Sequence, residues 1–151
     1  MFQKFNKEEV IKSLRAFFEK RDEIILAYLF GSVAEKRQNK LSDLDVAVLV
    51  EPKRLEELDK EPFGYQAAVM TDLMGLFHTN DVDVVILNNA TPLLAHEVVK
   101  YGIVVFCRDE DKNVEYEVRT RHRYLDTKPL REIQNFYFKE RIKKGLLSKV
   151  D

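Results

Sequence analysis

The sequence contains only one cysteine, Cys107, among its 151 residues, so it can form neither an internal disulfide nor a cysteine-based metal site. It also has no apolar run that approaches the length of about 20 residues needed for a membrane-spanning helix. The segment from Met1 to Lys4 lacks the apolar region of a signal peptide, and the chain has no internal repeat and no low-complexity linker. These absences predict a soluble cytoplasmic protein without membrane contact.

The residues that are present predict one domain of alternating helices and strands. Hydrophobic residues make up 45% and charged residues 34% of the chain, as is typical of globular proteins. Asn6 and Glu9 form a capping pair before a helical apolar stripe, and Ile24–Phe30 is a continuous apolar run typical of a strand covered on both faces. The other predicted elements are strands over residues 44–50, 82–87 and 103–106, and helices from Pro62, from Thr91 and along the C-terminal segment. This order indicates an α/β or α+β domain with a small central sheet.

Charge is distributed unevenly along the chain. The net charge is −1, but residues 119–149 hold ten lysines and arginines against three acidic residues, which leaves the rest of the chain near −8. Such asymmetry indicates an interaction surface at the C-terminal end. Arg119, Arg121 and Arg123 are the first residues that we expect to belong to this surface. A solvated helix face explains the same pattern equally well.

Two short motifs at the ends of predicted strands point to a chemical site. Gly31-Ser32 closes the first apolar run, and after ten intervening residues Asp43-Leu44-Asp45 opens the second. In a strand, residues i and i+2 face the same side, so Asp43 and Asp45 stand together and need a compensating cation. A small residue such as Gly31 lets backbone N–H groups approach a phosphate closely.

A third carboxylate occupies a similar position on another predicted strand. Asp83 stands at the start of that strand, and Asp81 shares its parity but lies nearer the turn, so it ranks second. Acidic residues at strand starts are poor core residues, and a metal–phosphate site would explain all of them. The three histidines, in contrast, show no metal-ligand spacing; they are His78, His96 and His122.

These motifs resemble a known family. Gly31-Ser32, ten intervening residues and Asp43-x-Asp45 resemble the signature of the DNA polymerase β-like nucleotidyltransferase superfamily. The short length and the stretch 42–48 are most similar to its minimal (MNT) branch, the antitoxins of HEPN/MNT toxin–antitoxin pairs. The resemblance implies the nucleotidyltransferase fold, with a small mixed central sheet flanked by helices and a C-terminal helical tail. It also implies transfer of AMP from ATP to a tyrosine hydroxyl of a HEPN ribonuclease toxin, which neutralises the toxin.

The same resemblance implies a role for each site residue. Gly31 and Ser32 would hold the triphosphate of ATP, and Asp43, Asp45 and Asp83 would hold two Mg²⁺ ions and act in catalysis.

The resemblance also implies a division of the chain. Residues 1–112 would form the nucleotidyltransferase domain, and 113–151 a C-terminal helical extension packed on the same domain.

Many relatives carry arginine and glycine where this chain has Glu35 and Lys36, and a carboxylate near the triphosphate is unfavourable unless it points outward.

HEPN ribonucleases resemble one another in an arginine followed, after four to six residues, by a histidine. No such pair occurs in this chain, so the toxin would be encoded separately. Assembly with the toxin or with a second copy stays open. Three alternatives also stay open: a non-catalytic antitoxin that acts by binding alone, a nucleotidyltransferase for a small-molecule hydroxyl, and a nucleic-acid binder, which the negative remainder of the chain disfavours.

Overall fold

The structure is a computed structural model that describes residues 6–31, 44–60 and 63–148, with side chains described as far as residue 145. Its elements are α1 (Lys7–Glu19), β1 (Ile24–Phe30), β2 (Leu44–Val50), α2 (Pro52–Leu58), α3 (Gly64–Phe77), β3 (Val82–Ile86), the 3-10 helix η1 (Leu87–Asn89), α4 (Pro92–Tyr101), β4 (Ile103–Cys107) and α5 (Glu110–Ser148). The predicted alternation of helices and strands is confirmed. The sequence pattern does not predict α2, for which Pro52 is the first residue.

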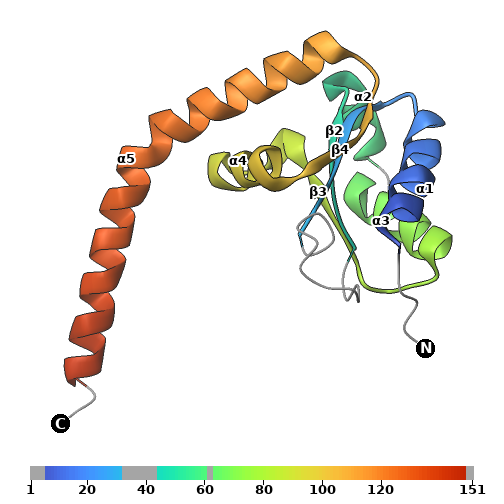
Figure 1. The fold of residues 1–151 in the computed structure, drawn as a ribbon. Helices are drawn as coiled ribbons and strands as arrows, with labels where there is room; N and C mark the ends of the chain where they lie inside the picture. The colour runs from blue at the N-terminus through green and yellow to red at the C-terminus, as the bar shows by residue number, and fades with distance from the viewer. Residues whose placement is uncertain (1–5, 32–43, 61–62, 149–151) are drawn as a thin grey trace.

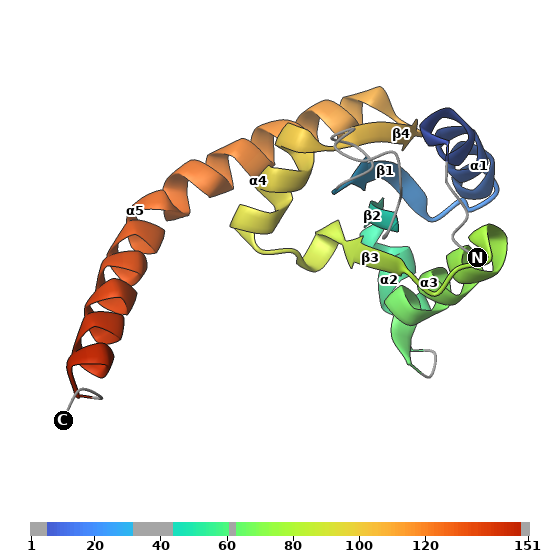
Figure 2. The same cartoon turned by 60° about the horizontal axis from the view of Figure 1, so that its bottom comes forward.

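The four strands form one mixed sheet (Figure 1), and their order is β3-β2-β1-β4 (Figure 2). β1 runs antiparallel to both of its neighbours, β2 and β4, whereas β2 runs parallel to β3. A parallel pair needs a long crossover connection, and α2 and α3 lie in the crossover between β2 and β3. The predicted fold class, a small mixed sheet flanked by helices, is therefore confirmed.

Helices α1 and α3 cover one face of the sheet (Figure 2). α1 begins after Asn6, whose side chain accepts a hydrogen bond from the backbone N–H of Glu8 at 3.0 Å. Val10, Leu14 and Phe18 then recur at helical spacing and are buried. The matching buried stripe of α3 consists of Tyr65, Val69, Leu73 and Phe77. The predicted helix start at Pro62 lies outside the described residues.

Helix α4 and the first part of α5 cover the opposite face (Figure 2). α4 begins after Thr91, whose hydroxyl oxygen accepts a hydrogen bond from the backbone N–H of Leu94 at 3.2 Å. The smaller core on this face consists of Ile25, Leu26, Tyr28, Ala47, Leu49, Leu87, Val98 and Tyr116. Both faces of β1 and β2 are thus covered, which explains their nearly continuous apolar sequences.

Helix α5 is 39 residues long and extends well beyond the sheet (Figure 1). Tyr116 and Thr120 are buried near its start, but none of residues 121–145 is buried. Its axis changes direction along its course, and Pro129, which cannot donate a backbone hydrogen bond, lies inside it (Figure 1). No helix in the described part of the chain has both the length and the hydropathy to span a bilayer. The division at residues 112 and 113 stays a prediction.

Candidate active site

Two of the predicted site carboxylates lie side by side at one end of the sheet. Asp45 and Asp83 are each the second residue of their strand, and the parallel register of β2 and β3 pairs them directly. Neighbouring strands are about 4.8 Å apart, and residues paired in register face the same side. The preceding residues, Leu44 and Val82, are buried in the core beneath α1 and α3, so the two aspartates face the side of α4 and α5. Asp45 is half-buried and Asp83 is exposed.

Gly31 follows β1 directly and lies against this carboxylate pair. Its φ of +82° is in the left-handed region that favours glycine. Phe30, the last residue of β1, pairs with Asp45 across the sheet, and a Cβ on Gly31 would collide with the Asp45 carboxylate. Glycine is therefore required for the turn and for the close approach of Asp45, a reason that the sequence pattern does not predict.

Four residues of the predicted site region belong to the segment 32–43, which is outside the described ranges. Ser32 and Asp43, which the sequence assigns to phosphate and metal binding, lie outside the described residues. The same holds for Glu35 and Lys36. Their roles stay predictions.

Asp81, the carboxylate ranked second from the sequence, is exposed and precedes β3. Its backbone carbonyl oxygen accepts a hydrogen bond from the backbone N–H of Leu44 at 2.8 Å. This bond joins the start of β2 to the start of β3. Asp81 thus helps to fix the register that brings Asp45 and Asp83 together.

The chemistry of the aspartate pair fits a hard divalent cation. Carboxylate oxygens are the ligands that Mg²⁺ prefers, and a cation relieves the repulsion between two adjacent negative charges. Within the described ranges, no group of three or more histidine, cysteine, aspartate and glutamate side chains is placed to hold a metal. The predicted third carboxylate, Asp43, is not among those ranges.

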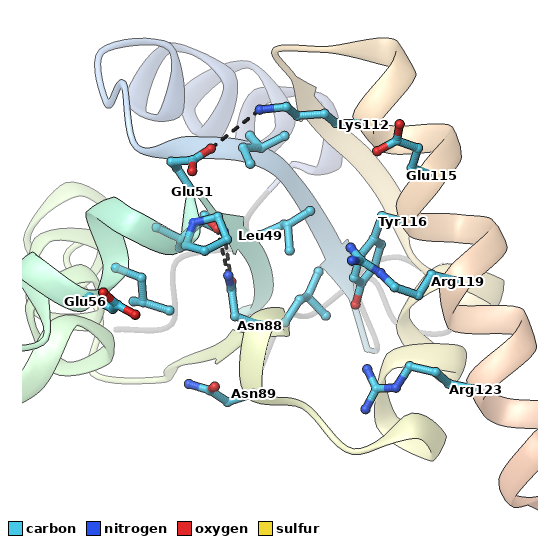
Figure 3. A pocket seen from close by; sticks show the side chains of 15 residues that line it. Leu49, Glu51, Glu56, Asn88, Asn89, Lys112, Glu115, Tyr116, Arg119 and Arg123 are labelled. Carbon is cyan, nitrogen blue, oxygen red and sulfur yellow. Dashed lines mark hydrogen bonds and ion pairs between the residues drawn. The ribbon is translucent and has the colours of Figure 1, made fainter.

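The structure separates the three arginines that the sequence groups together. Arg119 and Arg123 line a pocket beside α2 and η1 (Figure 3). Arg121 instead lies near His96 of α4, where its positive charge contributes to lowering the pKa of that histidine, although burial is the largest cause. The helical period could have indicated this separation. Because successive helical residues are about 100° apart around the axis, Arg121 faces roughly away from Arg119 and Arg123.

The similarity of the chain to known proteins agrees with this geometry. Residues 12–111 match the family described as Polymerase beta, Nucleotidyltransferase. The match covers most of the chain and includes all the predicted site residues, so the protein belongs to this family of nucleotidyltransferases. The superfamily resemblance expected from the Gly-Ser and Asp-x-Asp motifs is confirmed.

Within that class, the chain is 30% identical over 118 residues to the protein adenylyltransferase MntA of Shewanella oneidensis. The aligned region covers 78% of this chain and 76% of MntA. Its fold is also similar to a chain in the crystal structure of a toxin–antitoxin with AMP-PNP, at 25% identity and a TM-score of 0.67, over 89% of this chain and 98% of that one. A chain in the structure of a tri-AMPylated Shewanella oneidensis HEPN toxin in complex with MNT antitoxin has the same fold, at 23% identity and a TM-score of 0.57, over 87% and 94% of the two chains.

Proposed function

We propose that this protein is an antitoxin that transfers AMP from ATP to a tyrosine hydroxyl of a HEPN ribonuclease toxin and thereby neutralises it. The observation that carries the proposal is the pairing of Asp45 with Asp83 beside Gly31, in a chain of the nucleotidyltransferase family. The similarity to the protein adenylyltransferase MntA supports a protein hydroxyl as the acceptor. The toxin–antitoxin structure with AMP-PNP supports ATP as the nucleotide.

In the proposed reaction, the tyrosine hydroxyl attacks the α-phosphate of ATP, a new P–O bond forms, and pyrophosphate leaves. Ser32 and the backbone N–H groups around Gly31 would hold the triphosphate in position for an in-line attack. Asp83, which is exposed, would accept the proton of the hydroxyl. When bound by Asp43, Asp45 and Asp83, two Mg²⁺ ions would neutralise triphosphate charge and lower the pKa of the attacking hydroxyl.

The distal half of α5 offers a surface for the toxin. Within the described part of the chain, residues 121–145 include several large apolar side chains that are at least 45% exposed, namely Leu125, Leu130, Ile133, Phe136, Tyr137, Phe138 and Ile142. A soluble protein seldom exposes so many of them on one segment without a partner. The toxin is the proposed occupant, because residues 119–149 hold ten lysines and arginines against three acidic residues and the related folds come from toxin–antitoxin structures.

Mass spectrometry of the toxin tests the proposal. The partner is the HEPN protein of the same organism, recognised by its arginine–histidine spacing, and it is incubated with this protein, ATP and Mg²⁺. We expect the mass of the toxin to rise by whole AMP groups located on tyrosine, and we expect no rise in excess chelator. A toxin that is inhibited in the complex without gaining AMP would instead indicate a non-catalytic antitoxin.

A pair of matched variants makes the test specific to the site. Asp83→Asn removes a paired carboxylate, whereas Asp81→Asn changes an exposed aspartate that precedes the strand and contributes its backbone carbonyl. We expect the first to abolish AMP transfer and the second to leave transfer within about threefold of the parent. Equal losses in both variants would contradict the assignment of the site to Asp45 and Asp83.

A further inference from the structure

The pocket that Arg119 and Arg123 line lies at the end of the sheet opposite the candidate active site, and Figure 3 shows it from close by. Its volume is about 670 Å³, which suits a small organic molecule. The walls come from α2, η1 and α5, and Leu49 of β2 and Leu87 of η1 are among the apolar residues that line it. Leu49 lies on the same face of β2 as Asp45 but four residues further along, which corresponds to about 13 Å of strand.

Two arginines of α5 supply positive charge to this pocket. Arg119 and Arg123 lie one helical turn apart and both line it (Figure 3). The guanidinium of Arg119 lies 5.9 Å from the centroid of the Tyr116 ring. Neither arginine forms a salt bridge with another residue of the described ranges. Their charges are therefore available to a ligand.

A buried hydroxyl without a partner lies beside these arginines. Tyr116 lines the pocket, is only 3% exposed, and its hydroxyl has no hydrogen-bond partner among the described residues. The hydroxyl of Thr120 is nearby, but it too lacks a well-formed hydrogen bond within that part of the chain. Burial raises the pKa of Tyr116, while the nearby Thr120 hydroxyl and then the charges of Arg123 and Arg119 oppose this rise, so the hydroxyl stays protonated and can donate. A buried polar group without a partner is costly unless a ligand satisfies it.

The acidic residues around the pocket limit where an anion could lie. Glu51 is held by Lys112, with 3.5 Å between the Lys112 Nζ and the Glu51 carboxylate, and so carries a compensated charge. Glu56 and Glu115 also line the pocket, and they disfavour a large polyanion. The region between Arg119, Arg123 and Tyr116 is the part that favours a single negative group.

We propose that this pocket binds a small organic anion, whose phosphate or carboxylate group contacts Arg119, Arg123 and the hydroxyl of Tyr116 while its apolar part lies against Leu49 and Leu87. Guanidinium groups bind both kinds of anion through paired, charge-assisted hydrogen bonds. The proposal does not depend on the acceptor or the partner proposed above. It assigns to the chain a ligand site at the end of the sheet away from the candidate active site.

Methyl NMR of the full chain, with phenyl phosphate as the probe, tests the proposal directly. We expect the methyl signals of Leu49 and Leu87 to shift in a saturable manner, and to do so equally in the Asp45→Asn variant, because Asp45 lies about 13 Å along the strand from this pocket. Phenylacetate replaces the phosphate by a carboxylate, and the tighter of these two probes identifies the kind of anion. Benzyl alcohol retains the ring without the charge and should bind at least about tenfold more weakly.

Variants on the two sides of α5 supply the control. The double change Arg119→Gln with Arg123→Gln should raise the Kd for phenyl phosphate by at least about tenfold, whereas Arg121→Gln should leave it within about twofold. Tyr116→Phe should weaken binding severalfold while the melting temperature of the free protein stays the same or rises, because a hydroxyl without a partner is lost. A purely structural Tyr116 would lower the melting temperature instead.

Three results would overturn the proposal. The first is the absence of any shift at Leu49 and Leu87 with phenyl phosphate or phenylacetate at millimolar concentration. The second is equal binding of benzyl alcohol, which would make the pocket merely apolar. The third is an unchanged Kd in the double arginine variant, which would place the probe elsewhere.

Discussion

The two ends of the sheet present different charged groups and acquire them in different ways. At one end, Asp45 and Asp83 come from neighbouring strands, and their separation is set by the hydrogen-bond register. At the other end, Arg119 and Arg123 come from one helix that packs over the sheet. Strand register leaves little freedom, as phosphoryl-transfer chemistry requires, whereas long arginine side chains on a helix can adapt to ligands of several shapes.

The largest expected effect is at the carboxylate end. Asp45→Asn should reduce AMP transfer by at least about a thousandfold, because positioning and charge stabilisation are the main contributions to such reactions. The melting temperature should stay the same or rise, since repulsion with Asp83 is relieved. Toxin modification and thermal unfolding are measured on the same preparation. A markedly lower melting temperature would show that Asp45 has a structural role.

Glycine variants test how closely the carboxylate end is packed. Gly31→Ala places a Cβ against the Asp45 carboxylate at a φ of +82°, so we expect a loss of about 2–3 kcal/mol in unfolding free energy together with lower transfer. Gly75→Ala is the control, because a Cβ there meets nothing within 4 Å and alanine favours the helix by up to about 1 kcal/mol. Denaturant unfolding measures both, and a stable, active Gly31→Ala protein would contradict the geometry.

Another pair of variants tests the opposite end of the sheet. The side chain of Asn88 accepts a hydrogen bond from the backbone N–H of Val50 at 2.9 Å and donates one to its carbonyl oxygen at 2.7 Å. Asn88→Ala should therefore cost about 1–2 kcal/mol of stability without changing AMP transfer. The adjacent Asn89 is exposed, so Asn89→Ala should change stability by less than about 0.5 kcal/mol. A loss of transfer in Asn88→Ala would mean that the two ends are coupled.

The smallest expected effect concerns the contact that holds α5 against α4. His96 stacks on Tyr124 with 3.7 Å between ring centroids, and burial is the main reason that the pKa of His96 is lowered. Because the folded state binds this proton less readily than the unfolded state, the contribution of His96 to stability is present above its ordinary pKa of about 6.5 and is lost as the pH falls through the lowered value. His96→Gln should therefore weaken the acid sensitivity of unfolding. Identical pH profiles for the parent and the variant would contradict this.

The apolar periodicity of the sequence predicted most of the helices and strands, but it did not predict which of them pair or pack together. The sequence pattern did not predict the short helix α2, because its seven residues, which begin with Pro52, are too few for a clear helical stripe; only Leu55 among them is buried. The stack of His96 on Tyr124 joins α4 to α5, and no local sequence pattern predicts it. Such contacts depend on how the helices dock.

The sequence by itself determined the alternation of helices and strands, because side-chain periodicity is a local property, and its Gly-Ser and Asp-x-Asp motifs indicated the class of enzyme. Only the tertiary structure decided that Asp45 lies beside Asp83, since the parallel register of β2 and β3 joins residues separated by a crossover. It likewise decided that Arg119, Arg123 and Tyr116 line one pocket together with residues of α2 and η1. Both arrangements depend on contacts between segments distant in the chain, and the packing of the two cores on the sheet determines those contacts.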